Sequence, residues 1–138
     1  MRNRKVIIIV AVFVLLFIWI QSAVPEKKSA HESDWFRINV VNPVARFLNQ
    51  PEPTKDDVRK AAHAVEFGIL SIVVVILWKG NIVRSFYTGF TVAFLDESLQ
   101  ILTKRGALVK DVWVDLIGVA IGTAIGYLIW KTKANRSL

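Results

Sequence analysis

The sequence predicts an all-α integral membrane protein, a bundle of four transmembrane helices with a polar extracytoplasmic connection between helices one and two. Hydrophobic residues make up 54% of the chain and the mean hydropathy is +0.44, which are both high for a soluble protein. The apolar residues are also segregated into four runs, each near the roughly 20 residues that cross a bilayer. Because the hydrocarbon offers backbone groups no water, such runs must be helices. At 138 residues, the chain has room for one domain, 1–138.

The first apolar run covers residues 6–23 and follows the basic residues Arg2, Arg4 and Lys5. A secretory leader also has a basic start and an apolar stretch. This run is long for a leader, and its last three residues make a poor cleavage site. We therefore interpret it as a retained helix.

Residues 24–60 form a polar connection. Within it, the apolar residues of 35–48 are spaced as one face of a helix, which predicts a helix lying on the membrane surface. Pro43 would interrupt or start that helix. Thr54 with Asp57 three residues later is typical of a helix start.

The other three runs are 61–78, 85–102 and 112–130. The ends of the runs carry tryptophans, as an aromatic belt at the membrane interface would: Trp19, Trp78, Trp113 and Trp130. The acidic residues inside the second and third runs leave open an alternative, in which these two helices are buried in a soluble core.

The formal charge is +7, and many of the basic residues flank apolar runs. This placement favours anionic lipid head groups and topology control over nucleic acid binding. The chain has no cysteine, which excludes disulfides, cysteine-ligated zinc and thiol chemistry. Basic residues on the two sides of the predicted membrane are nearly balanced, and the N-terminal cluster decides the orientation. It predicts a multi-pass protein with both termini in the cytoplasm.

Polar and ionisable residues stand near the run ends: Ser22, His63, Glu66, Asp96, Glu97, Gln100, Asp111 and Asp115. Threading the runs up and down brings all of these positions, with Arg105 of the third loop, to one face of the membrane. Ionisable groups at membrane depth cost roughly 2.5–3.5 kcal/mol each on insertion scales, so they usually pair and mark function.

The carboxylates of this group outnumber the two balancing residues, Arg105 and His63. One hypothesis is that some carboxylates are protonated, and another is that a cationic ligand or a metal balances them. The simpler alternative is that the groups are solvated among the lipid head groups and merely hold the helices together.

A stripe of glycines, Gly118, Gly122 and Gly126, repeats every four residues along the fourth run. Such a stripe predicts close packing against another helix. Its two readings are packing within the bundle and a homodimer interface.

The chain resembles the VanZ-like family of small bacterial membrane proteins. The stretch from Arg59 to Gly68 is similar to the family's basic pair followed by His and, three residues later, Glu. A second block stands at the family's spacing: Asp96, Glu97, Gln100, Arg105, Asp111, Gly118 and Gly122. Ser22 and Pro25 resemble the family's serine-rich end of the first helix. Asp115 departs from the pattern, where Asn is commoner, which puts in doubt any role that needs a neutral amide there.

This resemblance covers nearly the whole chain and implies a role at the bacterial cell envelope, in the plasma membrane. It also implies lower susceptibility to teicoplanin, a lipid-anchoring glycopeptide, so the expected partners are membrane lipids, a lipid-linked envelope intermediate or the glycopeptide. The resemblance supplies a fold and a context and no reaction.

Two main functions fit the residues. The first is a binding module for a lipid head group or envelope intermediate, with a pocket lined by His63, Glu66, Asp96, Glu97, Gln100, Arg105, Asp111 and Asp115. Arg105 suits a phosphate or carboxylate there.

The alternative is a membrane enzyme that acts on a lipid-linked substrate. His63, Glu66 and Glu97 would then supply acid–base chemistry or hold a divalent metal, and Ser22 is a weaker candidate nucleophile. The sequence requires no cofactor, and it has neither a phosphate-binding glycine loop nor a nucleophile elbow. A third function, transport, is disfavoured because four helices are few for a transporter.

Overall fold

The computed structural model describes residues 2–23, 34–102 and 109–136, and every regular element in those ranges is a helix. The elements in chain order are α1 (Arg2–Ala23), η1 (Arg37–Val41), α3 (Asn42–Phe47), α4 (Lys55–Leu77), α5 (Ile82–Leu102) and α6 (Val109–Asn135). The all-helical fold predicted from the sequence is therefore confirmed for this part of the chain.

Three helices in the described ranges are long and apolar enough to cross a membrane: Arg4–Ala23, Lys55–Leu77 and Asp111–Asn135. These spans make the chain a multi-pass membrane protein. The helix α5 is not among them, although its 21 residues would reach across the hydrocarbon. Its carboxylates, Asp96 and Glu97, and its hydroxyl side chains lower its mean hydropathy.

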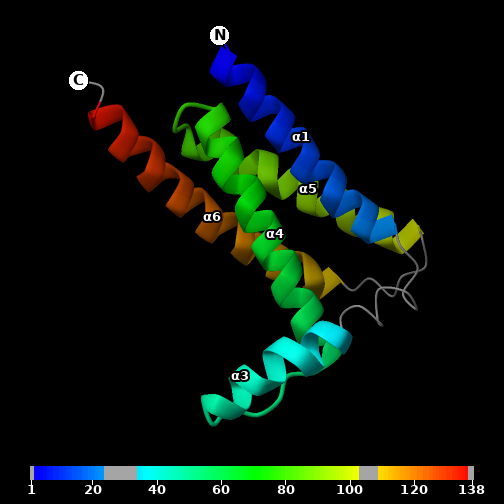
Figure 1. The fold of residues 1–138 in the computed structure, drawn as a ribbon. Coiled ribbons are helices and arrows are strands. Elements are labelled where there is room, and N and C mark those ends of the chain that lie inside the picture. The colour runs from blue at the N-terminus through cyan, green and yellow to red at the C-terminus, as the bar shows by residue number, and fades with distance from the viewer. Residues whose placement is uncertain (1, 24–33, 103–108, 137–138) are drawn as a thin grey trace.

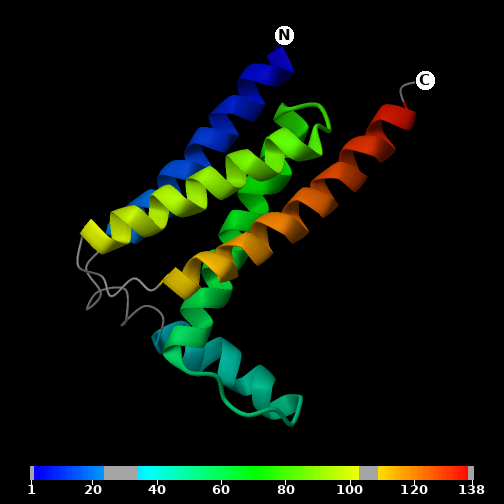
Figure 2. The ribbon, with the colours of Figure 1, turned by 180° about the vertical axis from the view of Figure 1, so that it is seen from behind.

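The four long helices pack as a bundle, with α4 between α1 and α6 and with α5 beside α1 (Figures 1 and 2). The N-terminus, the C-terminus and the turn between α4 and α5 all lie at one end of the bundle (Figure 1). Every one of the four helices contributes to a buried core, which consists of Ile18, Phe67, Leu70, Val74, Ala93 and Val119.

The start of α4 is set by a reciprocal cap. The Asp57 backbone N–H donates to Thr54 Oγ1 at 3.2 Å, and the Thr54 backbone N–H donates to Asp57 Oδ2 at 2.9 Å. The helix start predicted at these two residues is confirmed. The helix therefore begins before the apolar run that starts at residue 61, and its first two turns are polar.

The glycine stripe of α6 packs against α4 of the same chain. A Cβ atom on the glycine would overlap or crowd the α4 backbone at three places: Gly118 against Ala64, Gly122 against Gly68 and Gly126 against Ile72. The absence of side chains lets the two backbones approach closely. The stripe thus serves packing within the bundle, and a homodimer through it would require α4 to move away.

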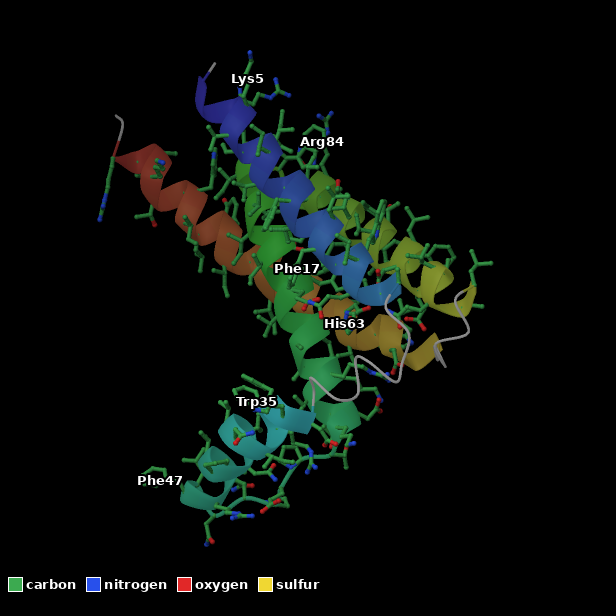
Figure 3. All side chains as sticks on the ribbon, turned by 45° about the vertical axis from the view of Figure 1, so that its right-hand side comes forward. Lys5, Phe17, Trp35, Phe47, His63 and Arg84 are labelled. Carbon is green, nitrogen blue, oxygen red and sulfur yellow. The ribbon has the colours of Figure 1, made fainter. Side chains whose placement is uncertain are left out.

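Residues 34–54, which we call the lobe, fold beyond the end of the bundle that lies opposite the termini (Figure 1). The helix predicted over 35–48 is present as η1 followed by α3, and Pro43 stands in the first turn of α3. The apolar residues Trp35 and Phe47 lie on the lobe, far from Lys5 and Arg84 at the other end (Figure 3). The lobe exposes several large apolar side chains, as a segment at a membrane surface would.

Polar contacts hold the lobe in shape. Asn42 Nδ2 and Arg46 Nε each donate to Glu52 at 2.6 Å. Asp34 forms an ion pair with Lys55 at the start of α4, and Arg37 donates to the same carboxylate at 3.0 Å. Hydrogen bonding from Lys55 and then from Arg37 lowers the pKa of Asp34 below its ordinary value. The lobe is therefore attached to α4 at neutral pH.

Candidate functional site

At the end of the bundle nearest the lobe, polar side chains from all four long helices lie together. We call this group the polar cluster: Gln21, Ser22, His63, Glu66, Asp96, Glu97, Gln100, Asp111 and Asp115. Figure 3 shows His63 in this half of the bundle. Arg105, which the sequence places at the same site, lies outside the described residues.

Asp96 on α5 is fully buried and receives two hydrogen bonds. Ser22 Oγ on α1 donates to Asp96 Oδ2 at 2.8 Å, and Gln100 Nε2 on α5 donates to the same oxygen at 2.9 Å. The carboxyl of Asp96 therefore ties the C-terminal end of α1 to α5. The other oxygen, Oδ1, has no hydrogen-bond partner among the described residues.

Glu66 on α4 is tied to α1 through Gln21, whose Nε2 donates to Glu66 Oε1 at 2.8 Å. His63 Nδ1 lies 3.9 Å from Glu66 Oε2, and the His63 ring stacks on Phe67 with centroids 6.5 Å apart. Sequence reasoning did not select Gln21 as a site residue. The available signal was its position, since it is a polar side chain at the end of an otherwise apolar run beside Ser22.

Two further carboxylates, Glu97 on α5 and Asp115 on α6, are also buried, with exposed fractions of 4% and 3%. Neither oxygen of Glu97 has a hydrogen-bond partner in the part of the chain that the structure describes. Asp115 is within electrostatic range of the carboxyls of Asp96, Glu97, Asp111 and Glu66. Like charges in a low dielectric repel one another strongly, so a cation placed among these carboxyls would be stabilised.

Cations reach the rim of the cluster from the first turns of α4. Lys60 Nζ lies 3.4 Å from Asp111 Oδ1 and 2.6 Å from Asp56 Oδ2. Arg59 is within electrostatic range of Glu97 and donates to Asp56 at 2.7 Å. The sequence pointed to His63 and Arg105 as the balancing groups. The basic pair 59–60 was visible only as part of the family motif, although it stands one turn before His63 on the same helix.

A metal site is not assembled among the residues that the structure describes. No group of three or more His, Asp or Glu side chains in those ranges has the geometry to hold a metal ion. His63, Glu66 and Glu97, the candidate ligands named from the sequence, are not such a group. The Gln21 amide engages Glu66, whereas Glu97 lies beside the carboxyls of α5 and α6.

The fold and this cluster define a class: a small multi-pass helical membrane protein with ionisable residues buried between its helices at one end. Within that class, the chain belongs to the VanZ/LLP1 family, whose model matches residues 6–131. The resemblance seen in the sequence is thus confirmed.

Among known proteins, the chain is similar to the uncharacterized membrane protein YwnJ of Bacillus subtilis (strain 168). The two are 30% identical over 78 residues, which are 55% of this chain and 54% of YwnJ. The match thus covers about half the length of that relative. No solved structure matches the chain.

Proposed function

We propose that this protein is a binding module for the amine-bearing head group of a membrane lipid or of a lipid-linked envelope intermediate. The observation that carries the proposal is the carboxylate of Glu97, which is buried beside Asp96 and Asp115 without a hydrogen-bond partner among the described residues. A buried, unpaired carboxylate is costly. An ammonium group entering the cluster would give it both a charge partner and hydrogen bonds.

The charge of the cluster selects the ligand chemistry. Five carboxyl groups belong to it: Glu66, Asp96, Glu97, Asp111 and Asp115. The basic side chains of Arg59 and Lys60 stand at its rim and already contact Asp56. A bare phosphate would meet net repulsion inside the cluster. An amine therefore binds at the centre, and a phosphate attached to it would lie at the basic rim.

In the same proposal, α5 is the fourth transmembrane helix, and the cluster faces the outside of a bacterial plasma membrane. The polar residues Asp96 and Glu97 of α5 are buried against the other helices, so they do not contact lipid tails. Both termini lie at one end of the bundle, which suits an even number of spans (Figure 2). Arg4, Lys5 and Lys131 stand near that end, and basic residues favour the cytoplasmic side.

The head-group preference can be measured by native mass spectrometry of the full chain in mild detergent, titrated with phosphatidylethanolamine or with phosphatidylglycerol. We expect the wild type to retain the amine lipid preferentially. Glu97→Gln keeps the size of the side chain and removes its charge. Because a hydrogen bond to a charged group contributes about 1.5–3 kcal/mol, the variant should lose that preference by about tenfold or more.

Glu52→Gln is the matched control, since it makes the same change in an exposed side chain of the lobe, outside the polar cluster and its basic rim. It should bind the amine lipid as the wild type does. Equal retention of the two lipids by the wild type, or an unchanged preference in Glu97→Gln, would overturn the proposal.

Membership of the family supports a second part of the proposal, that the protein lowers susceptibility to teicoplanin. Wild type, Glu97→Gln and an empty vector would be compared in a susceptible Gram-positive strain at matched membrane levels. We expect a raised inhibitory concentration only with the wild type. No protection by the wild type would refute the glycopeptide role. Equal protection by the wild type and Glu97→Gln would show that the charge of Glu97 in the polar cluster plays no part in it.

A further inference from the structure

An apolar groove of about 630 Å³ runs between the lobe and α4, beside the polar cluster. The lobe side of the groove is formed by Phe36, Val41 and Pro53, and the α4 side includes Ala62 and Val65. The volume is within the range of roughly 300–1,000 Å³ that is typical of small-molecule sites. The walls are almost entirely carbon, so the groove suits a hydrocarbon occupant.

The groove has its polar atoms at Asp57 and Glu66. Asp57 is already used as the cap of α4, where it accepts from the Thr54 N–H. Glu66 lines the groove and also accepts from Gln21 on α1, so this residue belongs to both the groove and the polar cluster. The groove and the site proposed for the head group therefore share Glu66.

The lobe is held at this distance from α4 by contacts at its two ends. Asp34 pairs with Lys55, and the Thr54 cap follows directly from the lobe into α4. Large apolar side chains of the lobe are exposed, Trp35 and Phe47 among them, and both are seen on the lobe in Figure 3. Exposed apolar side chains of this kind are typical of segments that lie in the head-group region of a membrane.

We propose that this groove holds an acyl chain of the lipid whose amine head group the polar cluster binds. The inference rests on the proposed function for the head group and adds the second half of the ligand. The occupant is a lipid hydrocarbon chain because the walls are apolar, the lobe beside the groove exposes large apolar side chains, and the groove shares Glu66 with the polar cluster. A ligand with an amine but no chain would then fill only half of the site.

The test uses the full chain reconstituted in vesicles of phosphatidylethanolamine and phosphatidylglycerol. A trace of phosphatidylethanolamine that carries a photoactivatable diazirine on its acyl chain is added, and adducts are mapped by mass spectrometry after irradiation. We expect adducts concentrated on residues 36–41 and 58–65. Ala62→Trp fills the groove and should reduce these adducts by roughly fivefold or more, because a packed site has no space left for the chain.

The matched control is Ala124→Trp, which places the same bulk on an exposed alanine of α6 away from the groove. It should leave the adducts unchanged. Helix content and monodispersity are checked for every variant, and Ala61→Trp, on the same groove wall, replaces Ala62→Trp if that variant does not fold. Adducts spread evenly over exposed faces of α1 and α6, with no effect of either groove variant, would overturn the inference.

The two proposals fail separately. Equal groove labelling by a diazirine phosphatidylglycerol would support the acyl-chain site and refute the amine preference. An amine preference that disappears in Glu97→Gln, combined with groove labelling that Ala62→Trp does not change, would support the head-group site and overturn the groove.

Discussion

At the scale of single residues, the buried hydrogen bond from Ser22 Oγ to Asp96 Oδ2 joins α1 to α5 through two residues that are 74 positions apart in sequence. Ser22→Ala removes this donor and leaves Asp96 in the bundle interior with Gln100 as its donor among the described residues. Since hydrogen bonds to charged groups contribute about 1.5–3 kcal/mol, we expect a loss of unfolding free energy of about this size. Reversible unfolding in mixed detergent micelles measures it.

The control for Ser22→Ala is Ser98→Ala on α5, because Ser98 Oγ donates to the Phe94 carbonyl of its own helix at 2.7 Å and so joins no second helix through this bond. This substitution should change stability by well under about 1 kcal/mol. A double-mutant cycle of Ser22→Ala with Asp96→Asn then isolates the pair. Additive effects of the two changes would show that the bond contributes nothing.

At the scale of helices, the close contact between α4 and α6 makes the effect of an added methyl group depend on which glycine is replaced. A Cβ on Gly122 would overlap the Gly68 backbone, whereas a Cβ on Gly68 would meet Gly118 O at 3.4 Å, an ordinary contact. We expect Gly122→Ala to destabilise the bundle by about 1–3 kcal/mol through overpacking. Gly68→Ala should stay within about 1 kcal/mol of the wild type.

The pair is its own control, since both variants replace glycine by alanine in the middle of a helix. Detergent unfolding compares them directly. Equal stability of Gly122→Ala and the wild type would mean that the two helices are not in backbone contact there.

At the scale of the whole molecule, the number of spans decides on which side of the membrane each loop lies. The chain has no native cysteine, so single cysteines report one position each. Four spans place Gln50→Cys outside and Lys79→Cys and Arg136→Cys inside. In intact cells, a membrane-impermeant maleimide should label only Gln50→Cys, and all three should react after permeabilisation. Labelling of Arg136→Cys in intact cells would instead indicate three spans, with α5 not crossing.

Much of the fold could be predicted because its determinants are local. The length of an apolar run sets whether a helix can cross the bilayer, and the Thr54–Asp57 spacing sets where α4 begins. Whether α5 crosses the membrane is harder to predict. Asp96 and Glu97 lower its mean hydropathy, and these two residues are tolerated inside a membrane because neighbouring helices bury them.

The candidate site could be predicted in position and only partly in its contacts. The alternation of helix direction was enough to place its members at one end of the bundle. The partners of Glu66 and Asp111 were not predicted, since Gln21 and Lys60 reach them from specific helix rotations. A shared end of the bundle also does not by itself bring three metal ligands to one point, and no such group is found among the described residues.

By itself, the sequence determined the membrane class, the family, the helical segments and the end of the bundle where ionisable groups gather. These follow from run length, capping and chain direction, which are read along the chain. Only the tertiary structure decided that the glycines of α6 face α4, that Glu97 lies buried without a described partner, and that the lobe and α4 enclose an apolar groove. Those features depend on the rotation and separation of helices, which arise from packing between segments distant in sequence.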